Sequence, residues 1–384
     1  MHGSAVVAGV GESTYFKRGQ SPQSEFQLAC TAIRKAVEDA GLKLQDVDGF
    51  VSYTDRNEPV RLSAALGTGD LNFTAQSFGG GGNGAAAAVT IADAAVTAGY
   101  ANCVVVYRAI AQGEFERYGQ APSTRSSRGA ASFTHPYGMM TAAQICAMQT
   151  MRYMQKHGVS QDSLAEVALA SNAHAQRNPR ALRYGTPLTR EQYHASRWIA
   201  EPFHLYDCCP ENDGAAAIVL TTPERGADLQ RTPVAIVAGA HGLEHLGGVG
   251  AFNEPGFPTA HYRQVERTLW SRAGVRPKDI KVAQFYENFT GPVLIAIAEM
   301  GFCEPEELND FVANGGLQWP GGRLPINTSG GNLGEGYIHG FENVVEAIRQ
   351  LRGDSTCQVD DAELCLSVSG PSFGPGSAVL FGRA

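Results

Sequence analysis

Several features common in other classes of protein are missing from this 384-residue chain. No Cys-x-x-Cys pair occurs and the eight cysteines are scattered, so we expect reduced thiols in a cytoplasmic protein, most of them small core residues. No apolar run of 18 residues and no charged leader with an apolar stretch is present, so we expect no membrane span and no signal peptide. Positive charge is not in excess, and the net charge of −8 argues against a nucleic-acid partner.

A glycine-rich loop lacks the residues that would make it reactive. Residues 77–100 read SFGGGGNGAAAAVTIADAAVTAGY, which predicts a loop over Gly79–Gly84 and then an Ala-rich helix, with no Cys, Lys or His in the loop. No Gly-Lys-Ser/Thr follows, so this is not a Walker loop, and no acidic residue stands where a dinucleotide fingerprint requires one. The loop still presents backbone N–H groups at the positive end of a helix. Its shape is that of an active-site loop without a nucleophile.

Strands and helices alternate along the chain, which indicates an α/β fold. We predict strands at 5–13, 47–53 and 101–110, and helices at 24–41 and 85–99, with Gly41 closing the first helix. Residues from about 111 to 205 are richer in Arg, His, Pro and aromatic residues, and we predict that they form an insertion on this scaffold. The scaffold resumes with a strand at 212–223.

The two parts of the chain repeat each other. AVEDAGLKLQDVDGFVSY ends at Tyr53 and LWSRAGVRPKDIKVAQFY ends at Tyr286, an offset of 233 residues. Each stretch has a helix end at Ala-Gly, an Asp–aliphatic pair and a strand that ends in Tyr. A glycine-rich loop, a helix and a strand follow in both, with SGGNLGEG as the second loop. We therefore predict two similar βα halves in one chain.

Polar residues gather where the predicted strands of the second half end. The loop INTSGGNLGEGYIHG and the strand end FYENFTG carry Asn327, Ser329, Asn332, Tyr337, His339, Tyr286, Glu287 and Asn288. Enzymes of the α/β class build sites at such positions. The segment HGLEH at His241–His245 has the spacing of an inverted zinc-peptidase motif, but it follows a strand among glycines, so we predict a loop and no metal. The neighbours Cys208 and Cys209 cannot easily chelate one ion, and we expect a core or loop role.

These segments resemble the thiolase superfamily, and within it the sterol-carrier-type or lipid-transfer-protein branch. The stretch RNPRALRYGTPLTREQYHASRWIAEPFHLYDCCPENDGAAAIVL resembles the end of the family's first half, INTSGGNLGEGYIHG its NPSGG…GHPLG segment, and FGPGSAVLF its closing glycine turn. The resemblance implies a thiolase fold with two duplicated βαβαβαββ halves, residues 1–225 and 226–384. It also implies a five-layered αβαβα structure with a loop domain inserted at about 111–205.

All four catalytic positions of a thiolase are replaced in this sequence. The resemblance places the nucleophilic Cys at Gly81, the His of the HDCF/NEAF motif at Tyr286, the His of GHP at Tyr337, and the last acid/base Cys near Gly370. Without an activated nucleophile, thiolysis or condensation through an acyl-enzyme is not expected. Both His positions became Tyr, which can still donate and accept a proton, so we expect changed chemistry rather than lost chemistry.

The subset of this branch with such replacements consists of bacterial steroid side-chain-cleaving aldolases. The resemblance implies retro-aldol cleavage of a 17-hydroxy steroid acyl-CoA to a 17-keto steroid and propionyl-CoA or acetyl-CoA. Tyr286 and Tyr337 would be the catalytic pair, with Tyr337 favoured as the base, and one would need activation because an ordinary Tyr has a pKa near 10. The residues expected to bind substrate or the enolate oxygen are Gly81, Gly82, Asn288, Asn332, His339 and Gly370.

The resemblance also implies partners but no cofactor or metal in this chain. The CoA thioester enters as substrate, and no Schiff-base Lys or covalent intermediate is required. Family members of this kind work with a small zinc-ribbon/OB-fold DUF35 protein, so any zinc is expected in that partner. A homodimer core is expected to pair through the sheet edge near ANCVVVYRA, giving a heterotetramer with two DUF35 chains.

Two alternatives remain open from the sequence. The first is a non-catalytic thiolase-like protein that binds acyl-CoA or lipid, or that serves as a scaffold; it predicts that Tyr286 and Tyr337 are buried apart and bonded to backbone. The second is a CoA-ester thiolase that uses Cys208 or Cys303 as nucleophile, which would require one of those thiols beside the glycine loop.

Overall fold

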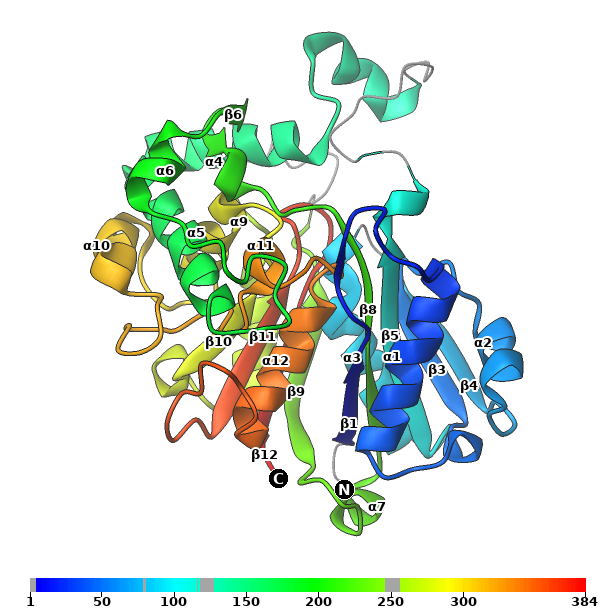
Figure 1. Cartoon of the computed structure of the whole chain (residues 1–384). Coiled ribbons are helices and arrows are strands. Elements are labelled where there is room, and N and C mark those ends of the chain that lie inside the picture. The colour runs from blue at the N-terminus through cyan, green and yellow to red at the C-terminus, as the bar shows by residue number, and fades with distance from the viewer. Residues whose placement is uncertain (1–4, 79–80, 116, 118–127, 246–255) are drawn as a thin grey trace.

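The computed structural model describes residues 5–78, 81–115, 117, 128–245 and 256–384. Figure 1 shows two α/β halves side by side. The main elements of the first half are β1 (Val6–Glu12), α1 (Glu25–Asp39), β3 (Gly49–Tyr53), α2 (Pro59–Leu66), β4 (Phe73–Ser77), α3 (Gly84–Thr97), β5 (Cys103–Ala111) and β8 (Asn212–Thr221), with the short β2 (Phe16–Lys17) on β8.

The second half repeats this order. Its elements are β9 (Val234–Gly242), α8 (Arg263–Ala273), β10 (Val282–Phe285), α9 (Thr290–Glu299), α10 (Leu308–Val312), α11 (Gly331–Gly334), α12 (Phe341–Arg352), β11 (Leu364–Ser369) and β12 (Gly376–Arg383). The predicted strand end at Tyr286 comes one residue early, at Phe285, but the Tyr286 N–H still bonds to Val368 O at 2.9 Å and continues the ladder.

Strand pairing shows the duplication most clearly. One sheet runs β10-β11-β12-β9-β1-β8-β5-β3-β4, so the order on either side of the β9–β1 junction is mirrored. The two halves pair their strands in the same way. The pairings of β3 with β5 and of β10 with β11 are parallel, and the next pairings inward, β5 with β8 and β11 with β12, are antiparallel. The bridge between Ala283 and Ile326 is parallel, as is the pairing of β3 with β4, so Ile326 occupies the place of β4 in the second half.

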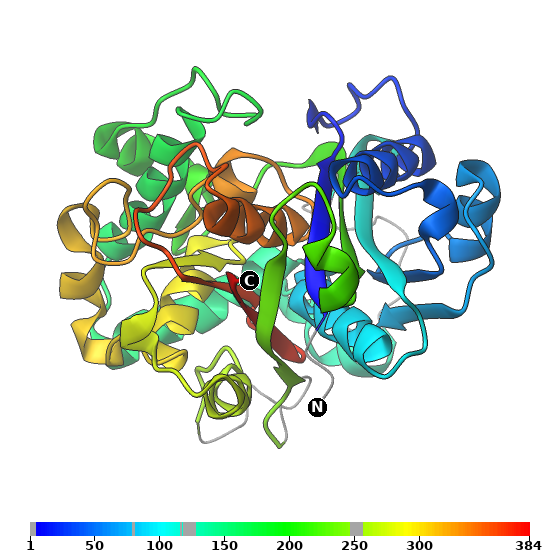
Figure 2. The same cartoon turned by 90° about the horizontal axis from the view of Figure 1, so that it is seen from below.

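Three buried clusters fill the spaces between layers, because alternate residues of a strand face opposite sides of its sheet. In β3, Phe50 belongs to the cluster beneath α1 and α2, whereas Val51 and Tyr53 belong to the cluster around α3 and α12. Both central helices contact strands of both halves. The third cluster lies under α8 and α9. Seen from below (Figure 2), α1 and α2 flank one half and α8 the other, which gives the expected layers of a thiolase fold.

Between β5 and β8 the chain forms an inserted set of elements: α4 (Ala142–His157), α5 (Gln161–Ala175), α6 (Arg190–Ala195), β6 (Trp198–Ala200) and β7 (Phe203–His204). In Figure 1 these elements lie above one end of the sheet, and α5 contacts α9, α10 and α11 of the second half. The predicted boundary between residues 225 and 226 falls in α7 (Pro223–Ala227), between β8 and β9, and stays a prediction.

One prediction about assembly is wrong. The segment near ANCVVVYRA was expected at a sheet edge, but β5 pairs with β3 on one side and β8 on the other and is buried along its whole length. The edge strand of this half is β4, which precedes the glycine loop instead of following its helix. A single sequence does not show strand order, because periodicity indicates that a segment forms a strand but not which strands lie beside it.

Candidate active site

Two tyrosines from distant segments meet at the centre of the site. Tyr286 follows β10, and Tyr337 lies on the turn between α11 and α12. Their hydroxyl oxygens are 2.7 Å apart, their ring centroids are 6.2 Å apart, and both side chains are buried. The Tyr337 N–H donates to Asn212 Oδ1 at 2.6 Å, which fixes its backbone to the first half of the chain. The pair therefore joins both halves through hydrogen bonds.

The glycine loop is packed against this pair. Gly79 and Gly80 lie outside the described residues, whereas Gly81 and Gly82 are described. A β-carbon on Gly82 would lie 2.6 Å from Tyr286 Cδ2 and closer still to Cε2. A β-carbon on Gly340, which has a φ of +82°, would lie 2.7 Å from Tyr286 Cδ2. The Tyr286 ring thus occupies the space between two glycines, so the loop has no room for a side chain at position 82.

Gly81 differs from its neighbour. Its φ is +57°, a left-handed conformation that favours glycine. A β-carbon built there has open space, with His339 Nε2 as its nearest neighbour at 3.9 Å. The position matched to the thiolase nucleophile therefore faces an imidazole nitrogen across a gap.

The space beside Gly370, the position matched to the last thiolase Cys, is occupied by Tyr262, which the sequence analysis did not identify. The Tyr262 hydroxyl donates to Gly370 O at 2.7 Å, and a β-carbon on Gly370 would lie 2.7 Å from that same hydroxyl. Tyr262 is fully buried, and burial raises the pKa of its hydroxyl well above the usual value. No motif surrounds Tyr262 in the sequence, so only the fold could reveal this contact.

Buried carboxyl groups lie directly behind the tyrosines. Asn332 Oδ1 accepts from the Glu287 N–H at 3.0 Å, and its Nδ2 donates to the Glu342 carboxyl group. Burial raises the pKa of Glu287 to about 8 and that of Glu342 well above its usual value, which favours the neutral acid form of each carboxyl group. Because both ends of the Asn332 amide bond to protein, its geometry suits positioning of Glu287 and α12. The predicted substrate contact of Asn332 stays a prediction.

Asn288 is buried and follows Tyr286 by two residues. Its carbonyl oxygen accepts from the Cys209 N–H at 3.0 Å. Its side-chain Oδ1 has no hydrogen-bond partner among the residues that the structure describes. Leaving a buried amide oxygen unpaired costs about 1–3 kcal/mol, which is consistent with the predicted role of Asn288 in binding a ligand.

His339 belongs to a buried chain of polar groups. Its Nδ1 is 3.0 Å from Arg108 Nη2, and Arg108 Nη1 is 3.0 Å from Asp55 Oδ2. Asp55 Oδ2 also accepts from the Ala109 N–H at 2.8 Å. His339 has a φ of +52°, unusual for a residue other than glycine, and its ring lies edge-on to that of Tyr337 at a centroid distance of 5.0 Å. Sequence reasoning found His339 but neither Arg108 nor Asp55.

The cysteines do not supply an activated nucleophile. Burial raises the pKa of Cys303 to about 12, and burial followed by the Asp207 charge raises that of Cys208 well above the usual value. A thiol reacts as its thiolate, so these shifts disfavour attack on a thioester. The neighbours that bear on the charge of Cys303 are Glu304, Glu307 and Arg323, all far along the chain from the glycine loop. These pKa shifts therefore give no support to a Cys208 or Cys303 thiolase.

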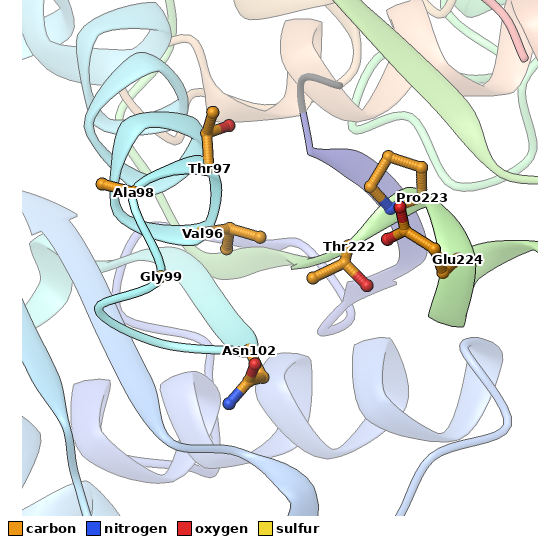
Figure 3. A pocket seen from close by; sticks show the side chains of 8 residues that line it. All are labelled: Val96, Thr97, Ala98, Gly99, Asn102, Thr222, Pro223 and Glu224. Carbon is orange, nitrogen blue, oxygen red and sulfur yellow. The ribbon is translucent and has the colours of Figure 1, made fainter. Parts of the chain in front are cut away.

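Cavities elsewhere on the surface do not coincide with the tyrosine pair. One of about 230 Å³ lies at the C-terminal end of α3 (Figure 3), lined by Val96, Thr97, Ala98, Gly99, Asn102, Thr222, Pro223 and Glu224. The glycine loop stands at the other end of α3, and a helix of 14 residues spans about 21 Å. The predicted loop at HGLEH is partly strand: β9 continues to Gly242 before the chain leaves the sheet.

Two further features are absent from the described part of the chain. Of its helices, none combines the length and apolar character needed to cross a membrane. Within the same part of the chain, no three His, Cys, Asp or Glu side chains are placed to hold a metal ion.

The fold and the site together define a thiolase-fold protein whose nucleophile position is glycine. Residues 245–380 match the family described as thiolase C-terminal domain-like. The whole chain is 40% identical to 17-hydroxy-3-oxo-4-pregnene-20-carboxyl-CoA lyase of Mycobacterium tuberculosis (strain ATCC 25618 / H37Rv) over 391 residues, covering 100% of each. It is 38% identical to the steroid side-chain-cleaving aldolase of Thermomonospora curvata, covering 99% of this chain and 98% of the relative.

A solved structure agrees with these relatives. The chain superimposes on the Ltp2-ChsH2(DUF35) aldolase with a TM-score of 0.92 and 37% identity, covering 100% of this chain and 98% of the other. The chain therefore belongs to the thiolase-fold family of steroid side-chain-cleaving aldolases, which are carbon–carbon lyases. The predicted fold class and family resemblance are confirmed.

Proposed function

We propose that this chain is the catalytic subunit of an aldolase that cleaves a 17-hydroxy steroid acyl-CoA to a 17-keto steroid and propionyl-CoA or acetyl-CoA. The observation that carries the proposal is the 2.7 Å contact between the Tyr286 and Tyr337 hydroxyls, beside a loop that has no nucleophile. The names of the relatives, a steroid carboxyl-CoA lyase and a steroid side-chain-cleaving aldolase, support the substrate class.

The reaction needs one proton moved from an oxygen to a carbon. The C17 hydroxyl loses its proton, the bond from C17 to the side chain breaks, and its electron pair forms the enolate of the thioester. That enolate is then protonated at the carbon released from C17. Because the proton lost equals the proton gained and no electrons are gained or lost, no oxidant, reductant or external proton donor is needed.

The tyrosine pair can carry this proton as a relay. Tyr337 accepts the proton of the C17 hydroxyl while its own proton passes along the hydrogen bond to Tyr286, whose proton goes to the enolate carbon. Burial, followed by the neighbouring Tyr337, raises the pKa of Tyr286 well above its usual value, so Tyr286 enters the reaction as a proton donor. A coupled relay removes the need for a stable tyrosinate, which such burial disfavours.

The remaining predicted groups would bind the thioester. The backbone N–H groups of Gly81 and Gly82 and the imidazole of His339 would supply hydrogen-bond donors beside the tyrosines. The Oδ1 of Asn288, unpaired among the described residues, is an acceptor and suits a donor group of the substrate. The non-catalytic carrier alternative expected two tyrosines buried apart and bonded to backbone. Their direct contact favours the enzyme.

A DUF35 partner and a homodimer core complete the proposal. The similar solved structure is that of the Ltp2-ChsH2(DUF35) aldolase, whose name supports a DUF35 partner. We propose that this partner is a small zinc-ribbon/OB-fold protein and that it carries any zinc. We place the homodimer contact at the edge strand β4, beside which Phe78 is 94% exposed. Two such partners would give a heterotetramer. The eight cysteines are free thiols, in keeping with a cytoplasmic location.

Incubation of the chain and a DUF35 partner with a 17-hydroxy steroid acyl-CoA tests the proposal. Mass spectrometry should detect the 17-keto steroid and the short acyl-CoA in equal amounts. A 17-deoxy steroid acyl-CoA, which has no hydroxyl proton to lose, serves as the matched substrate control and should stay intact. Tight binding of the 17-hydroxy substrate without either product would favour the carrier alternative.

A further inference from the structure

The buried chain of Asp55, Arg108 and His339 lies beside the glycine loop. Asp55 follows β3, Arg108 lies in the middle of β5, and His339 precedes α12, so the chain links both halves of the fold. The side chain of Asp55 is fully buried and that of Arg108 is 6% exposed. Burial alone would lower the pKa of Arg108, but the Asp55 carboxylate, Tyr53 and Glu25 together outweigh burial, and the net shift is upward. Arg108 therefore stays charged.

This arrangement determines which ring nitrogen of His339 carries the proton. A guanidinium only donates hydrogen bonds, and Arg108 presents Nε at 3.3 Å and Nη2 at 3.0 Å to the imidazole Nδ1. Nδ1 must therefore act as the acceptor. Burial and then the Arg108 cation lower the pKa of His339 well below its usual value, so the ring is neutral. A neutral ring with an accepting Nδ1 carries its single proton on Nε2.

The protonated nitrogen faces the position that holds the nucleophile in a thiolase. Nε2 is the nearest atom to a β-carbon built on Gly81, at 3.9 Å, and the His339 ring lies edge-on to Tyr337. The Tyr53 hydroxyl donates to His339 O at 3.0 Å and holds the backbone in its left-handed conformation. Such strain persists where surrounding structure imposes it, and it is concentrated at functional sites.

We infer that Arg108 and Asp55 are positioning residues that hold His339 as a neutral Nε2–H donor to the thioester carbonyl oxygen of the substrate, in the space next to Gly81. The inference rests on the proposed function, because that oxygen becomes the enolate oxygen when the bond to C17 breaks. A fixed neutral donor aimed at a developing negative charge stabilises the transition state more than the ground state. It also removes His339 from the set of candidate general bases, since its only lone-pair nitrogen is occupied by Arg108.

The inference predicts different effects on the His339 proton for substitutions that all alter this buried chain. Arg108→Lys keeps a donor-only group facing Nδ1, so the proton should stay on Nε2. Arg108→Gln offers both a donor and an acceptor, so the other tautomer becomes available. His339→Phe keeps a ring of similar size and removes the donor. Arg352→Gln is the matched control, because the Arg352 side chain is 2% exposed and its ion pair with Asp39 at 2.7 Å lies elsewhere.

The test uses the chain with its DUF35 partner and a 17-deoxy steroid acyl-CoA carrying a ¹³C-labelled thioester carbonyl. This analogue cannot be cleaved, so infrared spectroscopy can record its bound carbonyl stretch. Wild type, Arg108→Lys and Arg352→Gln should show a lowered stretching frequency, which His339→Phe and Arg108→Gln lose. With the cleavable substrate, His339→Phe should lower kcat by about 10²–10³-fold with little change in KM.

The outcomes separate the inference from the proposed function. If His339→Phe folds, as judged by its circular dichroism and melting temperature, and keeps both the carbonyl shift and the rate, the inference is overturned while the aldolase proposal stands. If the wild-type complex does not cleave the 17-hydroxy substrate, the proposed function fails and the inference fails with it. If Arg108→Gln keeps the shift that His339→Phe loses, the role of Arg108 is overturned. Should Arg108→Gln not fold, Asp55→Asn replaces it, because loss of the Asp55 charge also releases the guanidinium.

Discussion

Replacing Gly82 by Ala should disable the tyrosine pair, whereas the same change at its neighbour Gly81 should not. The added methyl at position 82 would lie 2.6 Å from Tyr286 Cδ2 and closer still to Cε2. Carbon atoms in contact prefer about 3.5–4.0 Å, so the ring must move by at least about 1 Å. Gly340 blocks part of the opposite side, where a β-carbon would lie 2.7 Å from the same Cδ2 atom.

The displacement has two measurable costs. Overpacking of this kind lowers the free energy of unfolding by about 1–3 kcal/mol. Moving the Tyr286 ring by about 1 Å also breaks the 2.7 Å hydroxyl contact, and a misplacement of that size lowers turnover by about 10²-fold. Gly81→Ala meets no such obstacle. Its left-handed φ of +57° costs about 1–2 kcal/mol of stability. Its methyl group would enter the space assigned to the thioester oxygen, so Gly81→Ala should lower turnover without displacing Tyr286 and should show no coupling to Tyr286→Ala in unfolding.

A double-mutant cycle isolates the contact. Urea unfolding would be measured for wild type, Gly82→Ala, Tyr286→Ala and the double variant, and product formation for wild type, Gly82→Ala and Gly81→Ala. In the Tyr286→Ala background no ring meets the new methyl, so the cost of Gly82→Ala should shrink and leave a coupling energy of about 1–2 kcal/mol. An equal cost of Gly82→Ala in both backgrounds would refute the packing argument, as would wild-type turnover of that variant.

Three other predictions concern titration, the thiols and assembly. Because burial raises the folded-state pKa of Glu287 from 4.5 to about 8, its contribution to stability is complete below 4.5 and is lost as pH rises through 8, at a cost of up to about 5 kcal/mol. Glu287→Gln should therefore lose less unfolding free energy than wild type over that window in urea titrations, and parallel curves would count against the buried acid. Iodoacetamide should leave turnover intact, and mass spectrometry should find no acyl group on any Cys; an acyl-cysteine trapped during turnover would overturn the mechanism. Solution scattering should show a dimer of this chain, and a monodisperse, active monomer would contradict the pairing proposed at β4.

The sequence predicted the elements that depend on local pattern. Strands around Val51 and Val105 and the Ala-rich helix α3 were recoverable from periodicity, and the repeat of Tyr53 at Tyr286 revealed the duplication. Family resemblance placed Tyr286 and Tyr337, and the structure brings their hydroxyls together. These inferences held because each rests on residues that are close in the chain or on a motif that recurs in the family.

The parts that could not be predicted are contacts between distant segments. Arg108 and His339 are 231 residues apart and Tyr262 and Gly370 are 108 apart, and no local pattern marks either pair. Strand order also depends on contacts between distant segments. The resemblance implied a sheet edge near β5, but β5 lies in the interior of the sheet. The raised pKa of Glu287 results from complete burial of its carboxyl group. A glutamate in a strand-end motif gives no sign in the sequence that it is buried.

Single-turnover cleavage by the Tyr286→Phe and Tyr337→Phe variants tests the central claim most directly. Each change removes one hydroxyl and leaves the ring, so the fold should survive. Tyr193→Phe is the control, since it removes a buried hydroxyl bonded to Asp207 at 2.8 Å in the inserted region. A proton relay predicts that each site variant, and their combination, lowers the cleavage rate by about 10²–10⁴-fold with little loss of substrate binding, while the control keeps its rate. Wild-type cleavage by the folded double variant would contradict the relay and direct attention to the buried acid Glu287 or to His135, a further acid/base candidate in the inserted region.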